Sequence, residues 1–157
     1  MELKNSYKKG LAAAACALVV LFLVGVYSVY VPPTSKTFLP TTTVTIGKTH
    51  IEAELAVTQV QREQGLSGRT YLSAGKGMLF VFDAPDTWGI WMKDMHFPID
   101  IVWADTNGMI ITIEHNVAPS SYPAHSFYPS NPAEYVLELP AGYTKAQSIA
   151  VGQKIVI

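Results

Sequence analysis

The sequence predicts a mainly β domain, a compact β-sandwich or partly closed barrel with one or two short helices, preceded by an N-terminal transmembrane helix. Three observations lead to this prediction. Short runs of strand-forming residues recur through residues 44–157, Gly and Pro residues separate them, and only two brief segments have helix signals. Many short strands separated by such turn residues are typical of sandwiches and barrels.

The first expected element is an apolar run from Leu11 to Val31 that contains no charged residue. About 21 residues at about 1.5 Å each reach roughly 31 Å, which is enough to cross a bilayer core. Because Lys4, Lys8 and Lys9 precede the run, the positive-inside rule places residues 1–10 in the cytoplasm and the rest of the chain outside. We therefore expect a single-pass protein of the bacterial inner (cytoplasmic) membrane with a periplasmic or extracellular C-terminal domain.

A cleaved signal peptide is the alternative to this anchor. The apolar region of a signal peptide usually has about 7–15 residues and ends at a small-x-small cleavage site. The run here is longer, and Val26-Tyr27-Ser28 is a poor cleavage site, which favours an uncleaved anchor. The sole cysteine, Cys16, lies within the run, so disulfides, thiol catalysis and cysteine-based zinc sites are excluded from the exported domain.

Residues 32–43 (PPTSKTFLPTTT) are rich in Pro and Thr and are expected to form a stiff, extended spacer. Residues 44–157 then have a length typical of one domain. This stretch contains 7 Lys and Arg against 11 Asp and Glu, which gives a net charge of −4. A mildly acidic domain argues against nucleic acid as a partner, because nucleic-acid binding needs a basic surface.

The strands are predicted from alternating apolar residues and β-branched runs. Ile51, Ala53, Leu55 and Val57 alternate with polar residues, as in a half-buried strand. The turn Asp105-Thr106-Asn107-Gly108 separates two further runs, which indicates a hairpin. The remaining strands are expected over the apolar runs 78–82, 99–104, 109–113 and 135–139.

Two short helices and one long loop complete the expected organisation. Thr58 to Gln64 opens with a capping-box pattern, Thr58-x-x-Gln61, and stops at Gly65. A second short helix is expected over residues 144–149. Residues 117–132 are Pro-rich and lack periodicity, and loops of that length are usually functional or mobile.

Four ordered blocks of residues resemble a known family. The blocks are Gly65-Leu66-Ser67-Gly68-Arg69, Gly77-Met78-Leu79-Phe80-Val81-Phe82, Trp91-Met92-Lys93 with Pro98-Ile99-Asp100, and Leu137-Glu138-Leu139-Pro140-Ala141-Gly142. Together they resemble the bacterial and archaeal family called domain of unknown function 192, over nearly all of residues 44–157. The resemblance implies an exported or membrane-anchored domain with a β-sandwich-like fold. It implies no activity, because the family has no agreed biochemical function.

The candidate site consists of charged and aromatic residues within those blocks, each next to apolar positions: Arg69, Trp91, Lys93, Asp100 and Glu138. If these side chains converge, they form a polar floor in an apolar pocket, which is the usual form of a small-ligand site. Trp88 and Trp91 would offer a face on which a sugar ring can stack. The alternative is a structural ion-pair network, for example Arg69 with Asp100 or Glu138, with the tryptophans as core packing.

The expected function is therefore binding of a small polar ligand, a sugar or an envelope fragment, by a membrane-anchored module without a cofactor. Two other functions stay open. Asp100 and Glu138 could supply the carboxylate pair of a hydrolase acting on envelope material. Met92, Met95 and His96 carry the soft ligands that select Cu(I), although two methionines on an extended strand at this spacing would point apart.

Overall fold

The computed structural model describes residues 39–157 of the chain. The expected cytoplasmic tail, the expected anchor over residues 11–31 and most of the expected spacer lie outside the described residues. Within the described part, every helix is too short or too polar to cross a membrane.

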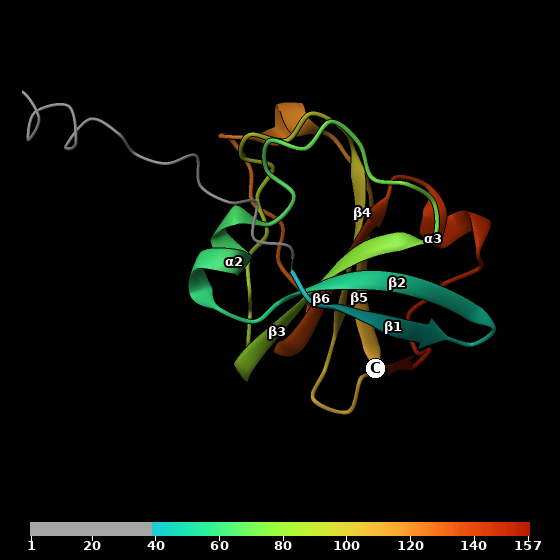
Figure 1. The fold of residues 1–157 in the computed structure, drawn as a ribbon. Helices are drawn as coiled ribbons and strands as arrows, with labels where there is room; N and C mark the ends of the chain where they lie inside the picture. The colour runs from blue at the N-terminus through green and yellow to red at the C-terminus, as the bar shows by residue number, and fades with distance from the viewer. Residues whose placement is uncertain (1–38) are drawn as a thin grey trace, which may run out of the picture. The chain divides into compact units, whose positions relative to one another are not determined.

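The described residues form one seven-stranded sheet with a helix on each side (Figure 1). The strands are β1 (Thr41–Ile46), β2 (Thr49–Ala56), β3 (Lys76–Asp86), β4 (Ile99–Ala104), β5 (Ile110–Val117), β6 (Ala133–Pro140) and β7 (Ile155–Val156). Their order across the sheet is β5-β4-β6-β3-β2-β1-β7, and β2 and β3 pair in parallel. The helical segments are α2 (Gln59–Gln64), the 3-10 turn η1 (Pro119–Ser121) and α3 (Tyr143–Ala146).

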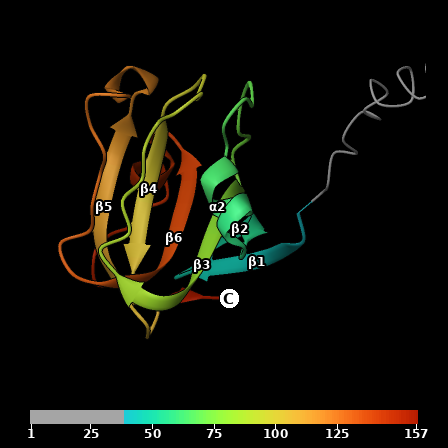
Figure 2. The ribbon, with the colours of Figure 1, turned by 90° about the vertical axis from the view of Figure 1, so that its left-hand side faces the viewer.

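The sheet curls into a half-barrel, and Figure 2 shows α2 lying against its β2–β3 side. Its two edges approach each other at one end, where Ile110 N donates to Gln153 O at 2.9 Å and Ile155 N donates to Gly108 O at 2.8 Å. The predicted mainly β class is confirmed. Of the two architectures expected, the described residues adopt the partly closed one. The alternative prediction, a sandwich of two sheets, is wrong because all seven strands belong to one sheet.

Local signals predicted several elements correctly. The capping box of α2 is complete, because Gln61 N donates to Thr58 Oγ1 at 3.3 Å and Thr58 N donates to Gln61 Oε1 at 2.9 Å. The hairpin turn joins β4 to β5 as expected, and β4 has the predicted bounds. Capping and turn residues act over a few positions, which is why the sequence alone shows them.

Several boundaries differ from those expected: β3, β5 and β6 all extend beyond the apolar runs 78–82, 109–113 and 135–139. β1 begins at Thr41, so the last three residues assigned to the spacer are strand residues, paired with Glu52, Ala53 and Glu54 of β2. A run of β-branched threonines forms a strand once a partner strand lies beside it. The second helix is also shorter and earlier than expected, Tyr143–Ala146 instead of 144–149.

Side chains of the sheet pack into two apolar clusters on its two faces. On the face that α2 covers, here the α2 face, lie Met78, Phe80, Ile101 and Trp103, among others. On the face that α3 covers, here the α3 face, lie Leu79, Val102, Leu137 and Leu139, among others. Since successive strand residues point to opposite faces, each charged residue of these strands can be assigned to a face by its register.

Asp100 points to the α3 face and anchors the chain that leads into α3. It is fully buried and pairs in register with Leu139. Its carboxylate accepts hydrogen bonds from Asn116 N (2.9 Å), Gly142 N (3.0 Å), Thr144 N (3.0 Å) and Thr144 Oγ1 (2.6 Å). Burial acts to raise the pKa of Asp100, but these hydrogen bonds outweigh it and hold the pKa below its usual value.

A longer hydrogen-bonded chain continues from Asp100 to the surface. Thr144 uses its one hydroxyl proton on the ionised Asp100 carboxylate, so its oxygen must accept the bond of 2.9 Å that joins it to His115 Nδ1. His115 therefore carries its proton on Nδ1 in this arrangement. Asp100 is thus a structural residue of the α3 face.

We expect Asp100→Asn to lower the free energy of unfolding by about 1.5–3 kcal/mol, the usual worth of hydrogen bonds to a charged group. The carboxamide loses the charge and turns its NH₂ group toward backbone or hydroxyl donors. Urea denaturation of the full chain measures the change. Asp83→Asn is the matched control because Asp83 is exposed; a loss for Asp100→Asn no larger than that of this control would contradict the anchoring role.

Candidate functional site

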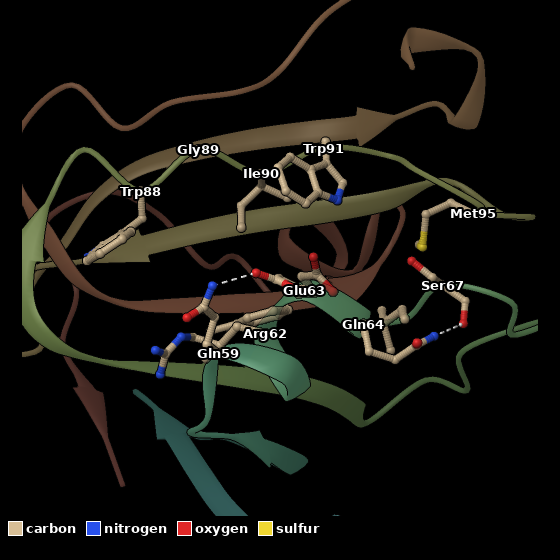
Figure 3. A pocket seen from close by; sticks show the side chains of 14 residues that line it. Gln59, Arg62, Glu63, Gln64, Ser67, Trp88, Gly89, Ile90, Trp91 and Met95 are labelled. Carbon is tan, nitrogen blue, oxygen red and sulfur yellow. Dashed lines mark hydrogen bonds between the residues drawn. The ribbon is translucent and has the colours of Figure 1, made fainter. Parts of the chain in front are cut away.

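A pocket of about 460 Å³ opens on the α2 face, between helix α2 and the 87–98 segment that joins β3 to β4 (Figure 3). Helix α2 supplies a polar wall, and the 87–98 segment supplies the opposite wall with its two tryptophans (Figure 3). The apolar floor consists of Leu66, Phe80, Ile90 and Met95. Both the volume and this mixture of apolar floor and polar wall are typical of small-molecule sites.

Short hydrogen bonds hold the two walls in place. Ser67 Oγ donates to Lys93 O at 2.8 Å, and Gly68 N donates to Asp94 O at 2.8 Å. On its other side, the 87–98 segment is tied to the 117–132 loop, because Ile90 and Phe127 exchange backbone hydrogen bonds of 2.9 and 2.8 Å. The 87–98 segment is therefore held by hydrogen bonds on both sides of Trp91, at Ile90 and at Lys93 and Asp94.

Gly65 shapes the entrance to this region. It ends α2 with a φ of +48°, in the region that favours glycine, and a Cβ there would lie 3.3 Å from the Phe80 ring. The Gly-Leu-Ser-Gly block therefore has a structural explanation: it turns the chain from α2 toward Lys93 and Asp94.

The two tryptophans of the 87–98 segment have different roles. Trp88 stacks on Phe82 with ring centroids 4.2 Å apart, and its Nε1 donates to Ala84 O at 3.1 Å. Arg62 closes this stack, with its guanidinium 4.9 Å from the Phe82 centroid. Trp91 remains 45% exposed at the pocket rim. The 87–98 segment is irregular and contains no strand. Trp91 is therefore the tryptophan with surface available for a ligand.

Glu138 contributes a carboxyl group to the pocket from the middle of the sheet. It is opposite Met78 on β3 and Ile101 on β4, so its side chain lies on the α2 face. The residue is 5% exposed, and its Oε2 is buried without a hydrogen-bond partner among residues 39–157. Burial raises the pKa of Glu138 to about 8, and the positive charge of Arg69 opposes this only in part. The protonated, uncharged form of Glu138 therefore predominates at neutral pH.

Arg69 does not neutralise Glu138 by pairing with it. Its guanidinium instead binds Glu54 with two hydrogen bonds, Nη1 to Oε1 at 2.5 Å and Nη2 to Oε2 at 2.7 Å. These bonds hold the pKa of Glu54 below its usual value, against the effect of its partial burial. Arg69 is thereby held by a different carboxylate, and the acid in the pocket is left alone.

The five residues of the predicted site are thus divided by the structure. Trp91 and Glu138 line the same pocket, and Arg69 lies close enough for its charge to act on Glu138. Asp100 is on the opposite face of the sheet. Lys93 has an exposed side chain and takes part through its backbone carbonyl, which accepts the bond from Ser67.

The carboxylate pair Asp100 and Glu138, considered for a hydrolase, is likewise split between the two faces. Adjacent register positions, Asp100 with Leu139 and Ile101 with Glu138, send the two side chains to opposite sides. The polar wall from α2, chiefly Gln59 and Glu63, was missed by the sequence analysis. Only the capping box marked this helix, and nothing local indicates that its exposed side faces a pocket.

The candidate copper ligands are also separated. Met92 and Met95 are 1% and 9% exposed and both pack in the apolar cluster of the α2 face, where Met95 contributes to the pocket floor. The condition for pointing apart, an extended strand, is not met, because the segment turns between them, with Met95 N bonded to Met92 O. His96 is exposed. Within residues 39–157, no group of three or more His, Cys, Asp and Glu side chains could hold a metal ion.

We expect the stability of the protein to fall as the pH rises from about 4.5 to about 8, in part because of Glu138. Its folded pKa is raised, so in this window the unfolded state loses the proton that the folded state keeps. The slope from one such group is at most about 1.4 kcal/mol per pH unit. Urea denaturation of the unmodified chain and of Glu138→Gln at pH 5, 6.5 and 8 measures it.

The Glu138→Gln variant keeps an uncharged group at every pH. Its free energy of unfolding should therefore increase relative to that of the unmodified chain as the pH rises to about 8. Two parallel stability curves would show that Glu138 is ionised in the folded protein, in conflict with the burial described above.

Comparisons with known proteins agree on the fold. Residues 42–157 match the family DUF192, described as an uncharacterised ACR. A solved protein of Sinorhizobium meliloti 1021, described as a proposed transcription regulator, is 31% identical with a TM-score of 0.73, over 78% of this chain and 97% of that one. A protein of unknown function from Novosphingobium aromaticivorans DSM 12444 is 29% identical with a TM-score of 0.72, over 81% of this chain and 91% of that one. No curated protein matches the chain. The chain therefore belongs to the DUF192 family.

Proposed function

We propose that this protein is a binding module for a small polar ligand, a sugar or an envelope fragment, and that its site is the pocket on the α2 face. The observation that carries the proposal is the carboxyl group of Glu138, buried on that pocket without a hydrogen-bond partner among the described residues. Buried polar groups are nearly always hydrogen-bonded. A ligand that reaches the pocket floor would supply the missing bond.

The energetic cost of Glu138 supports a functional reading. An acid whose pKa is raised by burial destabilises the folded state at neutral pH. An apolar residue there would extend the cluster formed by Met78, Phe80 and Ile101 on the same face. Groups that cost stability and line a cavity are typical of binding and catalytic sites.

The rim of the pocket suits a ring with an apolar face and polar edges. Trp91 exposes part of its indole beside the pocket, and aromatic side chains provide flat, rigid contact area. Across the pocket, Gln59 donates to Glu63 at 2.7 Å, which leaves further amide and carboxylate hydrogen-bonding capacity on that wall (Figure 3). A sugar ring has this combination of an apolar face and hydroxyl edges.

Our proposal for the location follows the apolar run over residues 11–31, which would anchor the module in the inner membrane with the pocket outside the cytoplasm. The relative from Sinorhizobium meliloti is described as a proposed transcription regulator. For this chain, the net charge of −4 over residues 44–157 favours a ligand other than nucleic acid.

Hydrolysis of envelope material is a second candidate, favoured by one observation. Glu138 has the raised pKa that a general acid needs, and Glu63, exposed on α2, lines the same pocket and would be the second carboxylate. The candidate carboxylate pair is thus Glu138 and Glu63. The pair Asp100 and Glu138, which the sequence suggested, is ruled out because its two members lie on opposite faces of the sheet.

We expect Trp91→Ala to weaken sugar binding about tenfold or more while leaving the melting temperature nearly unchanged. The indole is half exposed, so its removal takes more from the ligand than from the core. The measurement is a thermal-shift and calorimetric screen of the full chain against monosaccharides and muropeptides. Tyr71→Ala is the matched control, since Tyr71 is 71% exposed and does not line the pocket. Equal affinities for the two variants would place binding elsewhere.

For the hydrolase candidate, we expect Glu138→Gln to abolish release of reducing ends from peptidoglycan fragments while the fold is retained. A carboxamide has no acidic proton to transfer to a leaving group. Glu63→Gln should also reduce turnover, whereas Glu52→Gln, an exposed carboxylate outside the pocket, should not. No detectable turnover by the unmodified chain would remove this candidate and leave binding.

A further inference from the structure

The chemistry of the pocket floor indicates which kind of ligand group can bind beside Glu138. An uncharged carboxylic acid has one O–H donor and acceptor lone pairs. The floor around it is apolar, made of Leu66, Phe80, Ile90 and Met95. A complementary group therefore combines a strong, uncharged hydrogen-bond acceptor with an apolar neighbour. An acetyl group has both, in its carbonyl oxygen and its methyl.

A cationic group fits this floor less well. Arg69 lies close enough to act on Glu138 with its own positive charge, so a ligand cation bonded to Glu138 would also approach the guanidinium. It would have to lose its water against the four apolar side chains, which is costly for a charge. The carboxyl group of Glu63 on α2 lines the pocket wall, and its Oε1 already accepts a hydrogen bond of 2.7 Å from Gln59 Nε2.

A hydroxyl group fits the hydrogen bond but not the floor. It can accept from Glu138 as a carbonyl does, yet it brings no apolar atom to the surface formed by Leu66 and Met95. An acetamido substituent on a sugar ring satisfies both demands. Its ring can meanwhile lie against the exposed face of Trp91 at the rim.

We infer that the pocket takes an N-acetylated amino sugar, with the acetyl carbonyl accepting a hydrogen bond from the Glu138 carboxyl and the acetyl methyl on the apolar floor. This inference deepens the proposed function and rests on it, because it concerns the ligand of the same pocket. The raised pKa of Glu138 supports it, since the donor is present at neutral pH and is lost as the pH rises through about 8.

The test uses three sugars that differ in one substituent: N-acetylglucosamine, glucosamine and glucose. Calorimetric titration of the full chain gives their affinities at pH 6.5 and pH 9.5. At pH 6.5 the indole N–H resonances locate the binding: the signal of Trp91 should shift, and that of Trp103, fully buried with its Nε1 bonded to Trp88 O at 2.9 Å, serves as the internal reference.

At pH 6.5 we expect N-acetylglucosamine to bind about tenfold more tightly than either of the other sugars. Its affinity should fall about tenfold at pH 9.5, where Glu138 has lost its proton. Glu138→Gln should keep the binding and lose this pH dependence, because a carboxamide NH₂ donates at both pH values. Glu138→Leu, which removes the donor, should bind weakly at both.

Two results would overturn the inference alone. One is that all three sugars bind with equal affinity and all shift the indole N–H resonance of Trp91. The other is tightest binding of glucosamine that disappears in Glu138→Gln, which is the behaviour of an ion pair. A third result, no shift of Trp91 with any of the sugars or with muropeptides, would overturn the proposed function of the pocket and the inference with it.

Discussion

The unpaired carboxyl group of Glu138 is the constraint on which the chemistry of this fold depends. It lies on β6 between β3 and β4, where its neighbours on the same face are apolar. Arg69 is near enough to influence it but is held by two hydrogen bonds to Glu54. Because no cation among the described residues pairs with it, burial decides its protonation, and the pocket floor carries an uncharged acid instead of a salt bridge.

Most other residues of the family blocks serve to build the sheet around that acid. Gly77 lets β3 approach β6, since a Cβ there would lie 2.9 Å from Glu138 O. On the other face, Asp100 accepts three hydrogen bonds from Gly142 and Thr144 at the start of α3 and a fourth from Asn116 N of β5. Ser67 and Gly68 join the chain after α2 to the 87–98 segment. Some residues of these motifs therefore have structural roles. Glu138 and Trp91 belong to the same motifs, but the fold does not explain them.

The sequence predicts those parts of the structure that local chemistry determines. The capping box at Thr58, the hairpin turn at Asp105 and the strand Ile99–Ala104 depend on a few neighbouring residues. The grouping of the candidate site residues was predicted only in part, because strand register across the sheet decides which side chains lie together. A shift of one position sends Asp100 and Glu138 to opposite faces. No local pattern shows that Arg69 pairs with Glu54, which lies on β2, fifteen residues earlier in the chain.

The protonation state of the Glu138 carboxyl group can be measured directly. The side-chain carboxyl ¹³C resonance of Glu138, assigned by its absence in Glu138→Gln, can be followed by NMR as the pH of the full chain is raised from 4 to 10. We expect a titration midpoint at about pH 8. A midpoint near the ordinary value for glutamate, about 4.3, would show a solvated or paired carboxylate and would contradict this expectation.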